Sequence, residues 1–389
     1  MKKQISRILA TAVLSASLFI TSCSDDDNNS TKSTFVLDRE NLKGDINDGT
    51  VTLESGTYKL TGKLVVKETA KLVIKPGVII EATDATTDGV VRYIAIAQGG
   101  EIDVQGTASS PVVMTSTVKE PGKWGGLVIC GKAPINKGLT ASAEVSELTY
   151  GGAISNDSSG SIRYLRLEYT GYAYNNDKEF NGLSLFGVGS GTLIEYVQSY
   201  EGSDDAFEWF GGTVNAKYLV AFNGSSSVGD DIFDWTEGWN GTGEYWYGKR
   251  TNAGNRGIEA DNNSNNHTAT PISNPTLRNI TLIGAGDAGS EPQAIKLRVG
   301  TNVNFDNLVL SNWKTGFDIQ HNESLAFVTA GSLKATNVKF DNVATKSKGT
   351  DTAGAAVDVT SVYTENTNAT GAGNGTGVPN WATGWTKGL

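Results

Sequence analysis

The sequence has few of the residues that usually cross-link folds or carry nucleophilic and metal chemistry. Its 389 residues include two cysteines and two histidines. Cys23 lies in an export segment described below, so Cys130 has no partner for an intramolecular disulfide and is expected to be a buried thiol. The sequence also has no phosphate-binding loop, zinc-spaced cluster or dinucleotide fingerprint. The fold must therefore rest on packing and hydrogen bonds.

Basic residues are also scarce. The chain has 32 Lys and Arg residues against 42 Asp and Glu residues, which gives a formal net charge of -10. A negative field of this kind repels phosphate backbones and anionic lipid headgroups. We therefore expect no nucleic-acid partner.

Long hydrophobic runs are absent. The mostly apolar stretch of residues 8–20 follows three basic residues and is too short to cross a hydrocarbon core unaided. This pattern is typical of an export signal, and the junction at residues 20–23 resembles the lipobox of bacterial lipoproteins. The resemblance implies a signal peptide over residues 1–22 and a lipid on the thiol of Cys23, which would anchor the protein to a membrane. The alternative is a periplasmic protein cut nearby without a lipid.

The segment after Cys23 is polar and acidic, and we expect residues 23–34 to be a solvated tether. Asp25, Asp26 and Asp27 resemble the surface-export signal that Bacteroidota place after a lipidated cysteine. This resemblance implies an outer-membrane protein exposed at the cell surface, and a plain linker is the alternative. Removal of residues 1–22 takes away three basic residues and no acid, which changes the formal charge from -10 to -13.

Glycine is abundant, with 47 residues, and helical periodicity is almost absent. Six segments repeat a pattern in which Tyr or Asn precedes an aliphatic residue and a short alternating strand. The aliphatic positions are separated by 32, 22, 61, 28 and 30 residues, and the gap of 61 can hold two coils or one large loop. The six segments begin at Tyr164, Tyr196, Tyr218, Asn279, Asn307 and Asn337.

Strands this short are stable only when they pair with the coils above and below. The repeat therefore predicts a right-handed parallel β-helix, an all-β solenoid with long loop insertions, as a single domain over residues 35–389. A β-sandwich is the alternative. Strand signals disappear over residues 364–379, and Trp381 and Trp385 are expected to cap the last coil.

The chain from Trp124 onwards carries four distinctive motifs, at residues 124–134, 160–169, 204–214 and 381–385. They resemble a family of β-helical lipoproteins of Bacteroidota and related marine bacteria. The resemblance implies a β-helix at the outer membrane and no particular reaction, because the family has no settled activity. Its association with TonB-dependent uptake implies a TonB-dependent receptor as a partner.

A doubled acidic motif is the sharpest feature of the sequence. Its two copies are 26 residues apart, about one coil, so equivalent residues should stack. Carboxylates about 5 Å apart repel one another and need a cation, hydrogen bonds or raised pKa values. Calcium is the natural ion for oxygen-only ligands. The expected stacks are Asp204 on Asp230, Asp205 on Asp231, Glu208 on Asp234, Phe207 on Phe233 and Trp209 on Trp235, with Glu259 and Asp261 continuing the row.

Three interpretations of this row remain open. The acids could cap turns, which we weight first. They could hold calcium for a saccharide, with Asp204, Asp205, Asp230, Asp231, Glu259 and Asp261 as ligands. They could be a catalytic set of Asp204, Asp230, Glu208 and Asp234, since retaining glycosidases separate their carboxyls by about 5 to 5.5 Å.

Two features argue against catalysis. Pectin-hydrolysing β-helices add a histidine-glycine site, and neither His267 nor His321 is flanked in that way. A lyase would need an Arg or Lys base, and the basic residues near the row match no lyase signature. Those residues are Lys249, Arg250, Arg256, Lys296 and Arg298.

An aromatic, glycine-rich segment at residues 235–247 lies within the 61-residue gap. On a loop, its flat rings would stack against sugar rings or a protein partner; the alternative is a segment folded onto the coil with buried rings. The candidate ligand-binding residues are Trp235, Trp239, Tyr245, Trp246, Tyr247 and Arg256. The sequence therefore favours a surface lipoprotein that binds a glycan or an uptake partner without catalysis, and a polysaccharide lyase or hydrolase is the alternative.

Overall fold

A computed structural model describes residues 32–175, 178–224, 229–251 and 254–389. The expected signal peptide, the expected lipidation site Cys23 and most of the expected tether lie outside the described residues. Lys32–Leu389 form one compact unit. In the described part of the chain, no helix is long and apolar enough to span a membrane.

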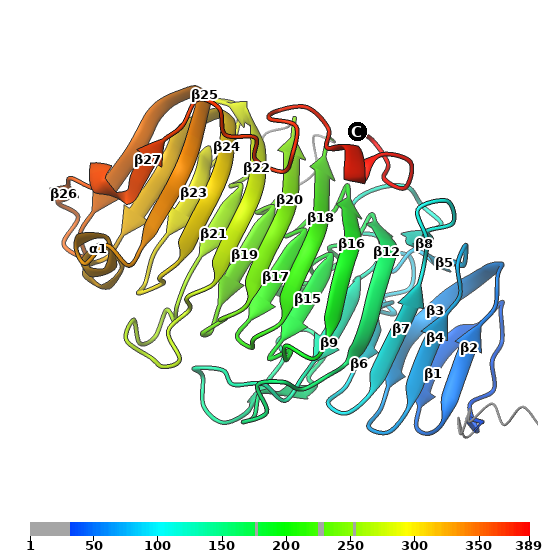
Figure 1. Ribbon diagram of the computed structural model, residues 1–389. Helices are drawn as coiled ribbons and strands as arrows, with labels where there is room; N and C mark the ends of the chain where they lie inside the picture. The colour runs from blue at the N-terminus through cyan, green and yellow to red at the C-terminus, as the bar shows by residue number, and fades with distance from the viewer. Residues whose placement is uncertain (1–31, 176–177, 225–228, 252–253) are drawn as a thin grey trace, which may run out of the picture. The chain divides into compact units, whose positions relative to one another are not determined.

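The unit is a stack of coils whose strands form three ladders (Figure 1). The first ladder contains β2 (Thr50–Leu53), β4 (Lys71–Ile74), β7 (Glu101–Gln105) and the beginnings of β12 (Gly160–Glu168), β16 (Leu193–Tyr200), β18 (Asn215–Asn223), β20 (Thr242–Arg250), β22 (Thr276–Gly286), β24 (Asn304–Gln320) and β25 (Lys334–Thr350). The second contains the start of β3 (Thr57–Val66), β5 (Ile79–Ala82), β8 (Val112–Ser116) and the continuations of β12 to β25.

The third ladder positions the candidate site. It contains β1 (Leu42–Ile46), the end of β3, β6 (Ile94–Ile96), β9 (Leu127–Cys130), β15 (Leu183–Phe186), β17 (Phe207–Phe210), β19 (Phe233–Thr236), β21 (Ile258–Ala260), β23 (Gln293–Leu297) and the ends of β24 and β25. Pairing along all three ladders is parallel. The predicted parallel β-helix is confirmed.

The remaining elements lie outside the ladders or at the last coil. They are the hairpin strands β10 (Ala141–Ser142) and β11 (Thr149–Tyr150), the hairpin strands β13 (Ala173–Asn175) and β14 (Lys178–Glu179), α1 (Asn322–Thr329), β26 (Ala356–Val357), β27 (Tyr363–Glu365) and the short 3-10 helices η1 (Thr360–Val362) and η2 (Asn380–Ala382). β26 and β27 both pair with β25.

The gap of 61 residues holds two coils. Trp246 pairs in register with Leu219 on one side and with Ile280 on the other. The sequence pattern missed this coil because an indole replaces the aliphatic residue. The expectation that residues 235–247 belong to a loop insertion is therefore wrong, since they form β19, a turn and the start of β20.

The repeated Tyr and Asn residues form a corner between the first and second ladders. Tyr196, Tyr218 and Asn279 have φ values of 58°, 58° and 61°, in the left-handed region that Asn tolerates better than Tyr does. Left-handed backbone costs about 1 to 3 kcal/mol at a residue other than glycine. Stacking of Tyr196 on Tyr164 and Tyr218, with centroids 4.3 and 4.4 Å away, offsets part of that cost.

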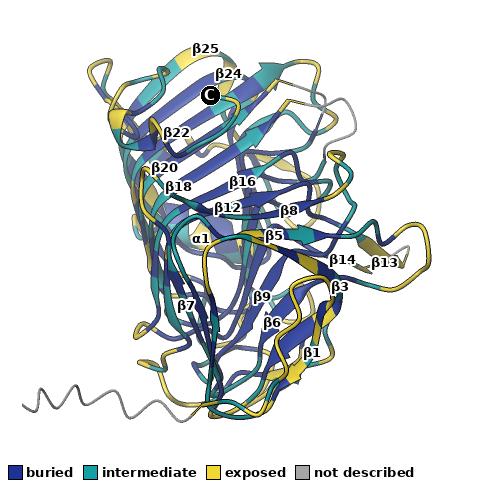
Figure 2. Cartoon of the chain, turned by 90° about the vertical axis from the view of Figure 1, so that its right-hand side faces the viewer, coloured by how far each residue is buried: buried dark blue, intermediate teal, exposed yellow. Residues whose placement is uncertain are grey.

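Apolar side chains fill the interior of the coils. Figure 2 shows that much of the length of the strands is buried. Phe207 stacks on Phe233 at 5.5 Å, as expected. Trp209 is opposite Trp235 in the backbone register, but its indole stacks on Trp239 at 4.7 Å and on Trp246 at 5.0 Å. The predicted pairing of Trp209 with Trp235 therefore holds for the backbone, while the rings take other partners.

The C-terminal segment does not cap the last coil with its two indoles. It runs back across the outside of the second ladder (Figure 1), where Trp385 meets Tyr164 and Trp381 meets Tyr218 edge-on. Lys387 pairs with Glu168 at 3.0 Å, 219 residues earlier in the chain. The predicted cap is wrong, because both indoles pack against the stacked tyrosines instead.

Candidate functional site

The acidic row lies on the third ladder and the turns that lead into it. Glu208 pairs with Asp234, and Asp234 pairs with Glu259, on β17, β19 and β21. The predicted stack of Glu208 on Asp234 is confirmed, and Glu259 continues it. The next coil then places Lys296 opposite Glu259. We call the eight acids the acidic strip: Asp204, Asp205, Glu208, Asp230, Asp231, Asp234, Glu259 and Asp261.

Two aspartates of the strip connect successive coils through the backbone. The Asp231 N–H donates to Asp205 Oδ1 at 2.7 Å, and the Arg256 N–H donates to Asp231 Oδ1 at 2.6 Å. Both side chains are buried, with exposed fractions of 7% and 1%. A buried carboxylate that accepts a backbone N–H stabilises a tight turn. The turn-capping interpretation therefore describes Asp205 and Asp231.

One end of the strip is neutralised by basic side chains. Arg256 Nη1 lies 3.1 Å from Asp231 Oδ2 and 3.0 Å from Glu259 Oε1. Arg298 lies 2.9 Å from Glu259 and 2.7 Å from Asp261. These contacts form an ion-pair network, so Arg256 and Asp261 are engaged with the protein itself.

At the other end of the strip, buried Arg250 donates to the backbone carbonyl of Asp230 and to no carboxylate in the described part of the chain. Among the described residues, no Lys or Arg forms an ion pair with Asp204, Asp205, Glu208 or Asp234. Asn181 donates an amide hydrogen bond to Glu208, whereas Asp234 Oδ1 is buried without a hydrogen-bond partner. Buried acids without counter-charges favour the protonated form.

The pKa values follow from this burial. Burial, and then repulsion by Glu179 and Asp230, raises the pKa of Asp204 well above its usual value. Burial, and then Asp234, raises the pKa of Glu208 in the same way. At the neutralised end, burial and the charge of Asp231 raise the pKa of Glu259 to about 7, against the opposing effect of Arg298 and Arg256.

Three groups of carboxylate oxygens lie close enough to share a cation. In each group, one oxygen from every residue lies within 4.8 Å of the others. Oxygen-only ligands at this spacing suit a hard cation such as Ca²⁺. Asp261, an expected ligand, belongs to none of the three groups and pairs with Arg298. The groups are Asp204 with Asp205 and Asp230, Asp205 with Glu208 and Asp234, and Asp231 with Asp234 and Glu259.

The aromatic residues singled out in the sequence do not form an exposed platform. Trp235, Trp239 and Trp246 are 0% exposed and Tyr247 is 1% exposed. Tyr245 is half-buried and stacks on Tyr218 at 5.1 Å. The expectation that these rings stack on a sugar is therefore wrong for the three indoles and Tyr247, because residues 235–247 are a coil whose large rings fill the interior.

Arg256 also fails as a free ligand-binding group. It is 4% exposed and holds Asp231, Glu259 and Glu291. Cys130 is 0% exposed, and burial raises the pKa of its thiol, so the expected buried thiol is confirmed.

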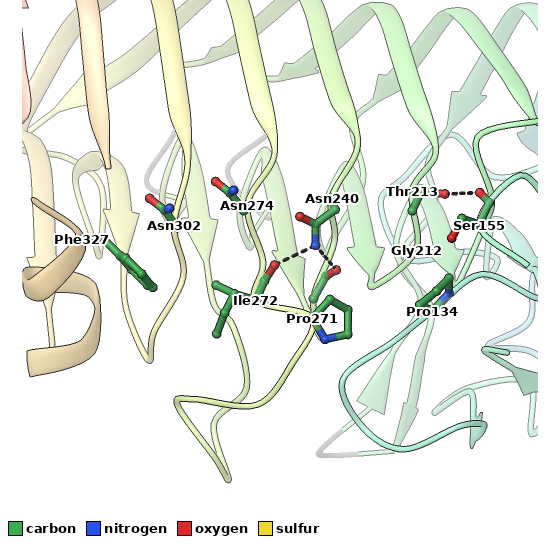
Figure 3. A pocket seen from close by; sticks show the side chains of 11 residues that line it. Pro134, Ser155, Gly212, Thr213, Asn240, Pro271, Ile272, Asn274, Asn302 and Phe327 are labelled. Carbon is green, nitrogen blue, oxygen red and sulfur yellow. Dashed lines mark hydrogen bonds between the residues drawn. The ribbon is translucent and has the colours of Figure 1, made fainter. Parts of the chain in front are cut away.

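A second concave feature lies at the corner between the third and first ladders, and the sequence reasoning missed it (Figure 3). It is a groove of about 470 Å³ without a charged side chain in its lining. Asn240, Asn274 and Asn302 occupy one row because their strands pair Thr242 with Thr276 and Thr276 with Asn304. We call it the neutral groove, lined by Pro134, Ser155, Gly212, Thr213, Gly238, Asn240, Pro271, Ile272, Asn274, Asn302 and Phe327.

The neutral groove had only a weak signal in the sequence. Each of the three asparagines stands two residues before a strand of the first ladder, at intervals of 34 and 28 residues. Asparagine before a strand is also what an ordinary turn contains. The row becomes visible only once the register of the coils is known.

Comparisons with known proteins identify the fold family. A family model for a pectate-lyase-like β-helix domain matches residues 44–386. No curated protein sequence matches the chain. Among solved structures, the family 28 exopolygalacturonase of Yersinia enterocolitica is similar over 78% of this chain and 71% of its own, with 11% identity and a TM-score of 0.20. The match over residues 44–386 shows that the chain belongs to the pectate-lyase-like β-helix family.

Proposed function

We propose that this protein is a lipid-anchored, surface-exposed β-helix that binds an extracellular glycan with the help of a calcium ion, and does not cleave it. The observation that carries the proposal is the group of Asp204, Asp205 and Asp230, whose oxygens lie within 4.8 Å of one another. No described Lys or Arg side chain forms an ion pair with this group. A cation would remove the repulsion among the three carboxylates.

Calcium also supplies a reason for the site to bind a ligand. Ca²⁺ takes six to eight oxygens, and three carboxylates that also serve the fold leave positions for outside oxygens. Asp204 and Asp230 are only half-buried, so these positions face a surface that a ligand can reach. Hydroxyl or carboxylate oxygens of a glycan would complete the shell.

Calcium binding is tested first by the thermal midpoint. Addition of Ca²⁺ to the protein in a metal-free buffer at pH 8 should raise the midpoint, and an Asp204→Asn, Asp230→Asn double variant should lose most of that rise. Asp287→Asn is the matched control, because Asp287 is exposed and belongs to none of the groups of close carboxylate oxygens. An unchanged midpoint with Ca²⁺ would remove calcium from the proposal.

Glycan binding is tested on an array of neutral and acidic glycans, probed with the domain in Ca²⁺ and in chelator.

Exposure at the cell surface is tested by protease accessibility in whole cells. Cys23→Ala should abolish labelling with a fatty-acid analogue and release the protein from the membrane fraction. A TonB-dependent receptor remains a proposed partner, and co-purification from the outer membrane under several growth conditions tests it.

A polysaccharide lyase or hydrolase is the second candidate. Membership of the pectate-lyase-like family supports it, and so do the raised pKa values of Asp204 and Glu208, because a raised pKa suits a carboxyl to act as a general acid. The basic side chains argue against it. Arg250 and Arg256 are buried and Lys296 is 8% exposed, so none is a free base for proton abstraction.

Turnover separates the two candidates. Purified domain with acidic and neutral polysaccharides should release no unsaturated or reducing ends. Release that disappears in Asp204→Asn or Asp230→Asn would establish the enzyme and refute the binding proposal.

A further inference from the structure

We infer that the neutral groove is a saccharide-binding site in its own right, for an uncharged segment of a glycan, and that it works without the acidic strip. This inference rests on the proposed glycan-binding function and adds a second surface, separate from the calcium site, for an uncharged segment of the glycan. The groove has about the volume of a small-ligand site, 470 Å³, on a corner of the coils.

The chemistry of the lining selects an uncharged ligand. None of the eleven lining residues is Asp, Glu, Lys, Arg or His. A uronate or phosphate group in the groove would lose water without gaining a counter-charge, which is unfavourable. Amide and hydroxyl groups beside apolar faces instead match sugar hydroxyls and the C–H faces of pyranose rings.

Several polar groups of the groove are available to a ligand. Asn274 is exposed, and its side-chain amide makes no hydrogen bond with the described residues. Asn302 uses Oδ1 to accept the Val303 N–H at 3.0 Å, which leaves its Nδ2 donors without a described partner. Asn240 uses Nδ2 for two carbonyls and keeps Oδ1 as an acceptor. The row therefore offers both donors and acceptors.

The amides also have a regular spacing. Asn240, Asn274 and Asn302 come from successive coils, and neighbouring parallel strands lie about 4.8 Å apart. This distance is similar to the length of one sugar unit in an extended chain. Phe327 from α1 and Ile272 give the row an apolar edge (Figure 3). A linear glycan lying along the coil axis would meet one amide per coil.

The groove is held in shape before any ligand arrives. Asn240 Nδ2 donates to Ile272 O at 2.7 Å and to Gly238 O at 2.8 Å. Asn262 is 0% exposed and fixes the loop between β21 and β22 with four hydrogen bonds, to Asn136, His267, Ala269 and Ser273.

The same loop is tied to α1. His267 Nδ1 lies 3.0 Å from Glu323 Oε2, so the wall that carries Ile272 and the helix that carries Phe327 are connected. A preformed groove avoids the ordering cost that weakens binding by flexible loops.

The test uses isothermal titration of the whole domain with neutral hexasaccharides of glucose, mannose and xylose, and with the acidic hexasaccharide of galacturonate. We expect a neutral hexasaccharide to bind with the same Kd in Ca²⁺ and in chelator. Asn274→Ala should raise that Kd about tenfold, the loss of one to two hydrogen bonds. Asn274→Trp should abolish binding because the indole would occupy the groove.

The controls separate a local effect from misfolding and from the strip. Asn368→Trp places the same ring at an exposed asparagine on the C-terminal segment, far from the groove in the chain, and should leave the Kd unchanged. Chelation, which would empty the strip of calcium, should also leave it unchanged, and so should Asp287→Asn at an exposed residue outside the strip and the groove lining. If circular dichroism shows that Asn274→Trp does not fold, Ser155→Trp replaces it, because its indole would fill the groove from the opposite wall. Asn274→Ala still measures what the amide contributes to binding.

The failures of the two proposals are distinguishable. Unchanged binding of the neutral hexasaccharide by Asn274→Trp would overturn the groove as the site. Binding of galacturonate alone, lost in Asp204→Asn, would place the ligand at the strip, which overturns the groove and preserves the proposed function. Failure of every saccharide to bind would overturn both.

Discussion

Replacement of Asp234 by asparagine tests whether repulsion among the carboxylates of the acidic strip lowers the stability of the folded protein. Asp234 Oδ1 is buried without a hydrogen-bond partner, and Asp234 shares one group of close oxygens with Asp205 and Glu208. Burial, followed by the charges of Glu259 and Asp231, raises its pKa well above its usual value. Asparagine keeps the shape of the side chain and removes the charge.

The size of the effect follows from the distances. Two ionised carboxylates whose oxygens lie within 4.8 Å of one another repel by about 3 kcal/mol or more at an effective dielectric constant of about 20. An unfolding entropy of about 2.1 cal/mol/K per residue, over roughly 360 residues, gives about 0.75 kcal/mol per degree. Relief of one such pair at alkaline pH should therefore raise the midpoint by about 4 °C.

The pH dependence has a definite sign. The pKa of Asp231 is raised from 3.8 to about 6 and that of Glu259 from 4.5 to about 7, chiefly by burial. A carboxyl whose pKa is higher in the folded state contributes stability that is fully present below the unfolded value and is lost as the pH rises through the folded value. Without calcium, the wild-type protein should therefore be less stable at pH 8 than at pH 5.

Scanning calorimetry in chelator at pH 5 and pH 8 measures the effect. Asp234→Asn should raise the midpoint at pH 8 and have a smaller effect at pH 5, because the raised pKa keeps more of the wild-type carboxyl protonated at the lower pH. Asp287→Asn, at an exposed position, should change neither. A lower midpoint for Asp234→Asn at both pH values would mean that the carboxylate makes a stabilising contact. That result would refute the hypothesis that repulsion among the carboxylates destabilises the folded protein.

Three further predictions concern the fold. Tyr196→Ala should lower the midpoint in thermal scans by more than Tyr196→Asn does. Both variants lose the ring stacking, but alanine also keeps the left-handed backbone strain of about 1 to 3 kcal/mol, which asparagine tolerates. Equal losses would contradict this prediction. Trp385→Ala removes a fully buried indole and should lower the free energy of unfolding by about 3 to 5 kcal/mol. Hydrogen exchange should then increase in β12 and β16, whereas an indole that capped the last coil would protect β25. Cys130 should resist maleimide in the folded protein and react after denaturation, and fast labelling under native conditions would show that the thiol is not buried.

The coil repeat could be predicted because its physical rules are local. Each coil must turn its apolar residues inward, and the distance between coils is fixed by backbone hydrogen bonding. The 26-residue interval between the two acidic motifs was therefore enough to pair Glu208 with Asp234. The same reasoning failed at Trp246, where an aromatic residue took an aliphatic position and a coil was interpreted as a loop.

The tertiary structure decided which side chains are exposed and which distant segments meet. Trp235 and Trp239 are buried because the interior of their coils has room for large rings, which no local pattern reports. Trp385 reaches the tyrosine stack through a contact across some 220 residues, and Lys387 reaches Gln198 across 189.

The sequence by itself determined the solenoid and the pairing of Glu208 with Asp234, since these depend on neighbouring residues and on the fixed rise of a β-coil. Only the tertiary structure separated the neutralised end of the strip, held by Arg256 and Arg298, from the end without ion pairs at Asp204 and Glu208. It also created the neutral groove, whose asparagines come from three coils. Burial and charge pairing are properties of the packed assembly, because each depends on which residues of other coils fill the space around a side chain.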